Sequence, residues 1–354
     1  MHIGIAGAGL LGRLLAFELT RAGHKVEVFD PAPGPQAPSA GVYAAGWTAA
    51  GMLSPTAELE SADENVFALG LRSLTLWPGI VAALGQPVEL RQRGSLLVAH
   101  RGDEGAARRV VDLLLHKAPS SHAPQALDAA DLRELDPAIH GATHAWLLPH
   151  EGQIHSVQAM AALAHAAAAA GARFHWGITV QRLQAGEIHT QQGLHTFDCV
   201  FDVRGTGARP QASSDGQDHG FTPGVRGVRG EIIWLHAPGV VLQRPVRLLH
   251  PRHRVYLVPR EGGRIVVGAS EIESEDRSPI SLRSMVELLA AAHSIIPELA
   301  EARIVHSETN LRPALPDNLP HVEQEPGLVR INGLFRHGWL IAPALVEQTL
   351  KKLT

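Results

Sequence analysis

The chain has 354 residues, a formal net charge of −4 and 45% hydrophobic residues. This length favours two domains over one simple core, and the slightly acidic balance argues against nucleic acid or an anionic membrane as a main partner. No continuous apolar run reaches the roughly 18 residues that a membrane span needs, so we expect no integral membrane contact. A single cysteine, Cys199, excludes an internal disulfide and favours a reducing cytoplasm. The first expected strand begins at residue 3, which leaves no room for a signal peptide before it.

The first thirty residues carry the most specific pattern. An apolar strand over residues 3–6 leads into Gly7-Ala8-Gly9-Leu10-Leu11-Gly12, and a helical pattern continues through Leu19. A second strand over residues 25–29 then ends at Asp30. This order of strand, glycine turn, helix, strand and acid predicts a dinucleotide-binding unit.

Each part of this fingerprint has a physical reason. Gly7 allows the tight turn, Gly9 lets a pyrophosphate approach the backbone, and Gly12 lets the helix pack closely on the sheet. The helix N-terminus offers unpaired N–H groups to the phosphates. Asp30 can accept hydrogen bonds from a ribose diol and would repel the extra phosphate of NADP. The fingerprint alone does not distinguish FAD from NAD.

A loop of small residues follows. After a Pro- and Gly-rich stretch over residues 31–39, the chain is small and apolar from Ala44 to Pro55. Small side chains let a backbone approach a flat ligand closely, although an ordinary packed loop explains the composition equally well. A second glycine turn at residues 204–207 follows an expected strand, where a dinucleotide sheet receives the other side of its ligand. A simple strand-end turn is the alternative there.

Beyond the small-residue loop, the patterns alternate between two styles. Helices with parallel-type strands return after each β-rich, antiparallel excursion. The expected architecture is a discontinuous dinucleotide domain over residues 1–86, 149–222 and 305–354, interrupted twice by a substrate domain over residues 87–148 and 223–304. We expect helices at 62–84, 104–116, 157–170, 282–293 and 343–350, a short helix from 128, and strands at 94–99, 173–176, 179–183, 198–203, 230–235, 246–249, 255–258, 264–268, 303–311 and 328–332.

The chain has 21 histidines, but they form no metal-binding pattern. His140 and His144 are four residues apart, yet Gly141 lies between them and Pro137 comes just before. No H-E-x-x-H or paired-cysteine motif occurs. We therefore predict no metal site and expect the histidines to be scattered over surface and loops.

Several motifs resemble a known family. Residues 310–320 are N-L-R-P-A-L-P-D-N-L-P, residues 332–344 are N-G-L-F-R-H-G-W-L-I-A-P-A, and residues 49–55 are A-A-G-M-L-S-P. A hairpin carries V-Y-L-V-P-R at 255–260 and V-G-A at 267–269. Together they resemble the D-amino-acid oxidase superfamily of FAD enzymes, and within it the glycine oxidases of thiamine biosynthesis. The likeness covers nearly the whole chain in the same order.

Three positions depart from the family's pattern. Asp30 stands where glutamate is more common, and His337 stands where asparagine is common. Residues 201–205, F-D-V-R-G, replace the usual small residues at the second FAD turn. We expect these departures to affect substrate preference more than the fold.

The resemblance implies an α/β fold, in which a Rossmann-like FAD-binding domain is joined to an α+β substrate domain with a mixed, largely antiparallel sheet. FAD is expected to be non-covalent, because the only thiol, Cys199, belongs to a buried-type strand far from the C-terminal segment. The FAD contacts implied by the resemblance are Gly7, Ala8, Gly9, Leu10, Leu11, Gly12, Asp30, Ala49, Ala50, Gly51, Met52, Val180, Gly205, Gly207, Arg312, Arg336, His337, Gly338, Trp339 and Leu340.

The implied reaction acts on the CH–NH or CH–NH₂ group of a small amino acid: glycine, sarcosine or a D-amino acid. The product is an imino or keto acid, and oxygen returns as hydrogen peroxide. Catalysis then requires the α-carbon to lie near the reactive flavin nitrogen. No dedicated base is predicted, because hydride transfer from a neutral amine needs a deprotonated substrate more than a protein base.

Four side chains are the candidates for this chemistry. Arg312, in the family's L-R-P position, offers the bidentate fork that a carboxylate needs. Tyr256 has a hydroxyl able to reach the same carboxylate. Arg336 is expected to contact the substrate or to neutralise charge developing on the flavin, and Met52 to wall the pocket. Structural roles in a loop, a sheet or the core are the alternatives.

Other functions stay open on the sequence. A related FAD amine dehydrogenase would oxidise a D-amino acid or D-proline with an acceptor other than oxygen. The fingerprint alone also allows an NAD-dependent dehydrogenase or a non-catalytic dinucleotide sensor, whereas the lack of a G-x-S-x-G elbow disfavours a hydrolase. The expected partners are an amino-acid or amine substrate and an electron acceptor. A homo-oligomer is compatible with the sequence, which does not define the oligomeric state.

Overall fold

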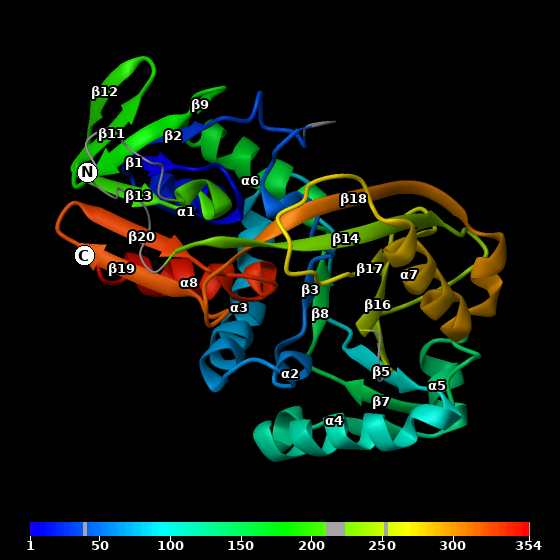
Figure 1. The fold of residues 1–354 in the computed structure, drawn as a ribbon. Coiled ribbons are helices and arrows are strands. Elements are labelled where there is room, and N and C mark those ends of the chain that lie inside the picture. Colours follow the sequence, from blue (N-terminus) through cyan, green and yellow to red (C-terminus); the bar gives the residue numbers. More distant parts are fainter. Residues whose placement is uncertain (38–40, 210–223, 251–253, 354) are drawn as a thin grey trace.

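The computed structural model describes residues 1–37, 41–209, 224–250 and 254–353, which are organised around two large β-sheets (Figure 1). Five neighbouring strands of the first sheet run parallel to one another, and only the edge strand β19 is antiparallel to its neighbour. The order of this six-stranded sheet is β19 (His321–Glu325), β20 (Leu328–Asn332), β13 (Cys199–Asp202), β1 (His2–Ala6), β2 (Lys25–Asp30) and β9 (Arg173–Trp176).

Helices cover one face of this sheet, and a small sheet covers the other. The strand β1 is apolar on both sides, with Ile3 and Ile5 fully buried, as expected for a central parallel strand. Its covering elements are α1 (Leu10–Arg21), α6 (Ser156–Ala169) and α8 (Gly338–Leu350) on one face, and the three-stranded sheet β10 (Val180–Gln184), β11 (Glu187–Thr190) and β12 (Gly193–Thr196) on the other.

The second sheet has eight strands and is antiparallel except where β15 pairs with β5. Helix α7 (Leu282–Ile295) packs on its strands β16 and β17, and α4 (Glu104–Lys117) packs beside β5 and β15. The order is β18 (Arg303–Ala314), β14 (Arg226–His236), β17 (Arg264–Gly268), β16 (Arg254–Arg260), β15 (Val246–Leu249), β5 (Ser95–Ala99), β7 (His144–Leu148) and β6 (Gln125–Leu127).

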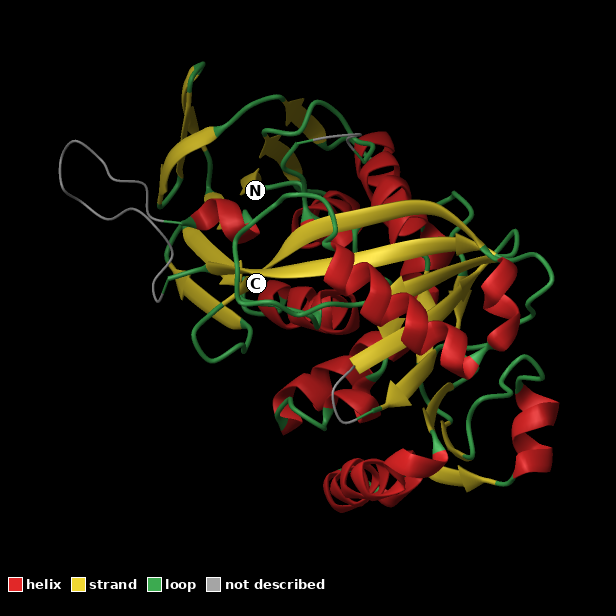
Figure 2. Cartoon of the chain, turned by 45° about the vertical axis from the view of Figure 1, so that its right-hand side comes forward, coloured by secondary structure: helices red, strands yellow, loops and turns green. Residues whose placement is uncertain are grey.

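Two long strands join the halves of the molecule. The paired strands β14 and β18 form one edge of the eight-stranded sheet and extend from it to beside the six-stranded sheet, as Figures 1 and 2 show. The shorter elements are β3 (Met52–Leu53), β8 (Gly152–Ile154) and β4 (Leu90–Arg91), which form a small sheet, the helices α2 (Pro55–Glu58), α3 (Glu64–Ala83) and α5 (Ala129–Leu135), and 3-10 turns at Ala45–Trp47, Arg101–Asp103, Ser120–His122, Gly205–Ala208 and Pro297–Glu301.

Helix α3 is long and apolar enough, by length and composition, to cross a membrane. In this structure its apolar face packs against α8. The rings of Trp77 and Trp339 stack with centroids 5.6 Å apart, and the Ser73 hydroxyl accepts the N–H of Ala344 at 3.1 Å. Burial against α8 therefore accounts for the composition of α3, and the absence of membrane contact stays a prediction.

The C-terminal helix begins earlier than the sequence pattern indicates. The pattern predicts a start at Pro343, but α8 begins at Gly338 and includes that proline. A proline has no N–H to donate to the carbonyl four residues before it, here that of Trp339. The indole Nε1 of Trp77 donates to this carbonyl instead, at 3.0 Å. The helix can therefore contain the proline without leaving a buried acceptor unpaired.

The expected α/β fold is confirmed, and so are the helices and strands predicted along the chain, within a few residues at their ends except at the start of α8. The sequence pattern missed the short helix α2 and the short or edge strands β3, β4, β6, β7, β8, β11, β12 and β19. The division into two domains stays a prediction. Its boundary at 222/223 lies outside the described residues, and strand β18 crosses the boundary at 304/305.

Candidate active site

A cavity of about 1240 Å³ lies between the two large sheets. One end is lined by Gly7, Gly9 and Asp30 from the six-stranded sheet and its first turn. The other end is lined by Tyr256 and Arg312 from the eight-stranded sheet. The cavity therefore connects the dinucleotide fingerprint with the predicted substrate residues.

The fingerprint end is shaped by glycines that no other residue could replace without movement. Gly7 has φ +103°, and a Cβ there would lie 2.8 Å from the carbonyl oxygen of Val203. A Cβ on Gly12 would lie 1.8 Å from the carbonyl oxygen of Gly7. Gly9 caps α1 without a side-chain hydrogen bond and lines the cavity, so the first-turn N–H groups of α1 are available to a ligand there.

Asp30 is fixed at the same end by the main chain. Its Oδ2 accepts the N–H of Ala8 at 2.6 Å, and its Oδ1 accepts the N–H of Ala32 at 2.8 Å. A carboxylate has acceptor capacity for further donors, such as a ribose diol. The glycine cradle, the open helix N-terminus and this acid together fit the adenosine diphosphate half of FAD.

The middle of the cavity is walled by the small-residue loop. Gly51 has φ +69°, and a Cβ there would lie 2.0 Å from the carbonyl oxygen of Ile154. The neighbouring Ala49 and Ala50 line the cavity as well, which fits a flat ring system. Met52 lies on β3, faces the cavity and packs with the apolar cluster that includes Tyr256.

The cavity brings together most of the predicted FAD contacts. Ala8 and Gly12 do not line it, because Ala8 supplies its N–H to Asp30 and Gly12 packs on Gly7. The individual contacts to FAD stay predictions. The predicted positions that do line the cavity are Gly7, Gly9, Leu10, Leu11, Asp30, Ala49, Ala50, Gly51, Met52, Val180, Gly205, Gly207, Arg312, Arg336, His337, Gly338, Trp339 and Leu340.

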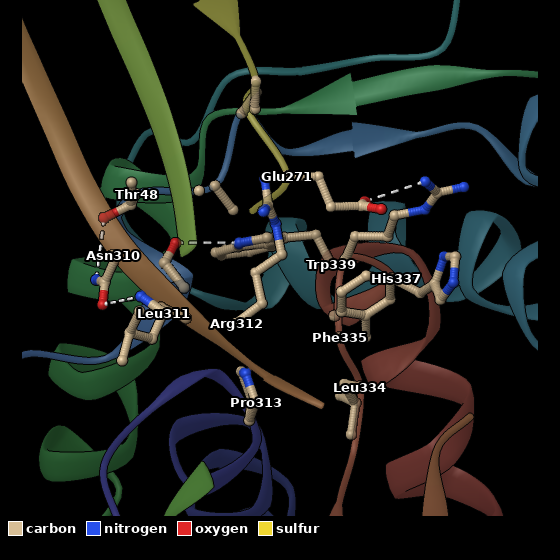
Figure 3. Close-up of a pocket in the computed structure, with 18 of the residues that line it drawn as sticks. Thr48, Glu271, Asn310, Leu311, Arg312, Pro313, Leu334, Phe335, His337 and Trp339 are labelled. Carbon is tan, nitrogen blue, oxygen red and sulfur yellow. Dashed lines mark hydrogen bonds and ion pairs between the residues drawn. The ribbon is translucent and has the colours of Figure 1, made fainter. Parts of the chain in front are cut away.

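Arg312 is the half-buried cation of the other end (Figure 3). Its Nη1 donates to the carbonyl oxygens of Arg229 at 3.3 Å and Ser270 at 3.1 Å. Within the described part of the chain, no carboxylate forms an ion pair with it. Burial lowers the pKa of Arg312, although the guanidinium remains charged at neutral pH. Its other N–H groups are therefore available for a carboxylate ligand.

Two glycines make the space for the predicted substrate side chains. A Cβ on Gly230, in the neighbouring strand β14, would lie 2.5 Å from Cζ of Arg312. A Cβ on Gly268, directly opposite Tyr256 on β17, would lie 2.6 Å from the Tyr256 hydroxyl oxygen. The sequence interpretation gave neither glycine a role, although a glycine inside a strand is a recognised sign of close approach.

Tyr256 is suited to donate a hydrogen bond. Burial raises the pKa of its hydroxyl, and the positive charge of Arg312 opposes this shift only in part. The phenol therefore stays protonated at neutral pH. It lies on β16 and lines the same end of the cavity as Arg312.

A buried carboxylate that the sequence interpretation missed organises three basic side chains. Glu58, at the end of α2, pairs with Arg247 Nη2 at 2.8 Å, Arg336 Nε at 2.9 Å and His337 Nδ1 at 3.2 Å. Although burial alone would raise the pKa of Glu58, Arg247 and Arg336 hold it well below its usual range. Residues 56–64, T-A-E-L-E-S-A-D-E, hold four acids, so the sequence does not single out Glu58.

Arg336 lines the cavity but already has partners. Besides Glu58, its guanidinium contacts the Ser61 hydroxyl and lies 3.4 Å, through Nη1, from Oε2 of Glu271. In Figure 3 a dashed line leads from the carboxylate of Glu271 to a guanidinium, which marks this ion pair. The structure thus separates the two predicted arginines, since Arg336 is neutralised by carboxylates and Arg312 is not. The role predicted for Arg336 stays a prediction.

Comparisons with known proteins agree with this geometry. Residues 2–349 match the family model of the DAO family, described as FAD dependent oxidoreductase. A Rhizobium etli protein, assigned to thiamine biosynthesis as the oxidoreductase ThiO, is 38% identical over 354 residues, which cover 100% of this chain and 96% of the relative. A glycine oxidase of Geobacillus kaustophilus is 28% identical and covers 96% of this chain and 89% of its own length.

Solved structures give the same result. The crystal structure of the glycine oxidase from Geobacillus kaustophilus superposes with a TM-score of 0.83 at 26% identity, covering 99% of this chain and 94% of that one. An iminodiacetate oxidase from Chelativorans shares the fold, with a TM-score of 0.78 at 23% identity over 98% of this chain and 93% of its own.

Proposed function

The chain belongs to the DAO family of FAD-dependent oxidoreductases, and from that premise we propose that it oxidises the amine of a small amino acid, glycine first, to the imino acid. The family resolves the cofactor as FAD rather than NAD. The observation that carries the proposal is Arg312, a half-buried guanidinium in the cavity that is held by main-chain carbonyls and has no ion pair among the described residues.

The fingerprint end would hold the nucleotide half of the cofactor. The first-turn N–H groups of α1 would bind the pyrophosphate beside Gly9, and Asp30, though shorter than the usual glutamate, would bind the adenosine ribose. FAD, when bound, supplies the two-electron acceptor for the oxidation. Non-covalent binding is favoured because the only cysteine, Cys199, is buried in β13 and does not line the cavity.

The opposite end would hold the substrate. Arg312 would bind the substrate carboxylate through its free N–H groups, and the protonated hydroxyl of Tyr256 would donate to the same carboxylate. Two fixed donors of this kind would restrict the rotation of a small amino acid and so orient its α-carbon toward the wall of small residues at 49–51, where the flavin ring would lie. The amine must lose its ammonium proton before it is oxidised, and water then hydrolyses the imino acid.

Several finer points rest on the relatives and on composition. The names of the similar proteins support glycine as the substrate and thiamine biosynthesis as the setting. We propose oxygen as the electron acceptor, with hydrogen peroxide as its product, and the cytoplasm as the location.

An anaerobic spectral titration of the purified flavoprotein tests the proposal. Glycine, sarcosine, D-alanine and D-proline are added separately, and bleaching of the flavin absorbance is recorded before and after air is admitted. We expect glycine to bleach the flavin at the lowest concentration, and air to restore the absorbance with release of peroxide. Bleaching without peroxide would replace the oxidase with an amine dehydrogenase, and a flavin that none of these amines bleaches would refute the proposal.

A further inference from the structure

A carboxylate of the protein, that of Glu271, lies near the arginine that is predicted to bind the substrate carboxylate. Glu271 lines the cavity in the loop after β17, and its side chain is 47% exposed. The residue before it, Ser270, supplies the carbonyl that accepts Nη1 of Arg312 at 3.1 Å. The Glu271 carboxylate is therefore attached to the backbone that fixes the substrate-binding guanidinium.

The basic side chains near Glu271 offer little free positive charge to a second bound anion. Within the described residues the one ion pair of Glu271 is with Arg336, and Arg336 is shared with the more deeply buried Glu58. Arg247 also forms an ion pair with Glu58. Among the cavity's half-buried arginines at this end, only Arg312 is left without a carboxylate in the described part of the chain.

Glu271 is also close enough to Arg312 for their charges to interact. Burial lowers the pKa of Arg312, and the negative charges that oppose this shift include Glu271. The carboxylate of Glu271 attracts the guanidinium of Arg312 and would repel an anion that is bound to it. In a site of reduced dielectric, this repulsion is larger than it would be in water.

We propose that Glu271 determines the charge selectivity of the substrate site, so that amines with one carboxylate are accepted and those with a second carboxylate are rejected. This inference rests on the proposed binding of a carboxylate by Arg312. One carboxylate takes the fork of Arg312, and a second would meet Glu271 while finding Arg336 already occupied. Replacing Glu271 by a neutral residue removes the repulsion and releases part of the Arg336 charge.

Binding of unreactive acids to the flavoprotein measures this selectivity directly. Glycolate carries one carboxylate and malonate carries two, and the Kd of each is read from the perturbation of the flavin spectrum. We expect Glu271→Gln to lower the Kd of malonate, relative to that of glycolate, by about tenfold. A ratio of the two Kd values within twofold of the unmutated ratio would overturn the proposal.

The matched control is Glu273→Gln. Glu273 lies two positions further on, does not line the cavity, and pairs with Arg226 at 3.0 Å with its side chain 68% exposed. The Glu273→Gln substitution changes the net charge of the protein by the same amount as Glu271→Gln, and we expect it to leave the ratio of the two Kd values unchanged. An equal shift in this control would assign the effect to net charge and overturn the role of Glu271. If Glu271→Gln does not fold with its flavin, Glu271→Ala provides the same test.

Turnover gives a second measurement with a substrate pair. Sarcosine and iminodiacetate share the glycine core and differ in a methyl or a carboxymethyl group on nitrogen. We expect Glu271→Gln to raise kcat/KM for iminodiacetate about tenfold relative to sarcosine. If no amine bleaches the flavin, the proposed function fails while the glycolate and malonate data still test Glu271. If glycine is oxidised but Glu271→Gln changes neither ratio, only the inference on Glu271 fails.

Discussion

The two ends of the cavity are built by different means. At the nucleotide end the groups that face a ligand are mainly main-chain N–H groups and glycines, with the carboxylate of Asp30, and most of them come from one continuous stretch between Gly7 and Asp30. At the substrate end they are charged side chains from separate elements, which are placed by one another. At the nucleotide end an added carbon atom on Gly7 or Gly12 would collide with the main chain. At the substrate end, binding depends on which charged side chains lack an oppositely charged partner.

Breaking the nucleotide end should have the largest effect. In Gly12→Ala the new Cβ would lie 1.8 Å from the carbonyl oxygen of Gly7, so the turn and α1 must separate. We expect the purified protein to contain no bound FAD and to unfold at a lower temperature. Flavin absorbance per mole of protein and thermal unfolding measure both effects.

Two other glycines provide controls. In Gly9→Ala the nearest atom to the new Cβ is 3.5 Å away, so we expect the apoprotein to keep its thermal midpoint and to lose affinity for FAD only. In Gly79→Ala, within α3, the Cβ meets nothing within 4 Å, so the FAD content should be unchanged and the thermal midpoint should not fall, because alanine favours a helix more than glycine does. A normal flavin content in Gly12→Ala would contradict the steric argument.

Breaking the charge network at the other end should cost stability. In Glu58→Gln the guanidinium groups of Arg247 and Arg336 lose their shared buried carboxylate, which we expect to lower the free energy of unfolding by about 3 kcal/mol near pH 7. Burial opposes the ionised form of Glu58, but the arginines hold its pKa well below the ordinary value of 4.5. The stabilisation is therefore present above pH 4.5 and is lost as the pH falls toward the lower pKa of the folded state.

Urea unfolding of the two proteins at several pH values tests this prediction. The difference in unfolding free energy should be constant above about pH 5.5 and should narrow below pH 4.5, where the unfolded carboxyl is protonated. A difference that widens as the pH falls would reverse the assigned sign.

The contrast between the ends also explains what the sequence could predict. The fingerprint from Gly7 to Asp30 is local, so its residues predict the turn, the helix and the position of the acid without information on the rest of the fold. Arg312 and Tyr256 were found through the family motifs. Glu58 was missed, because its partners Arg247 and Arg336 are 189 and 278 positions away and only the packed fold brings them together.

The start of α8 was misplaced for the same reason. A proline in a helical pattern indicates a helix boundary when only its neighbours in sequence are considered. The donor that makes Pro343 tolerable inside the helix is Trp77, and the carbonyl that it satisfies belongs to Trp339, 262 positions away. Long-range partners of this kind leave no mark on the local pattern.

Removing the free guanidinium should affect the substrate and leave the cofactor in place. We expect Arg312→Ala to raise KM for glycine about 100-fold with little change in FAD content, because the fork for the carboxylate is lost. Arg312→Lys keeps the charge without the fork and should fall between the two. Arg303→Ala, on the same strand with its side chain 73% exposed, is the matched control and should keep the parent KM. Unchanged glycine kinetics in Arg312→Ala would remove Arg312 from the site.

The smallest effect should come from moving that guanidinium without removing it. A Cβ in Gly230→Ala would lie 2.5 Å from Cζ of Arg312, so the side chain must shift while its charge and its strand remain. We expect KM for glycine to rise about tenfold, with kcat and FAD content changed much less, because a displaced fork loses geometry rather than charge. Gly239→Ala, where a Cβ meets nothing within 4 Å, is the control. Steady-state kinetics on both variants would show whether the substrate end tolerates an added methyl group better than the nucleotide end, as its construction from flexible side chains requires; a Gly230→Ala protein without FAD would contradict that difference.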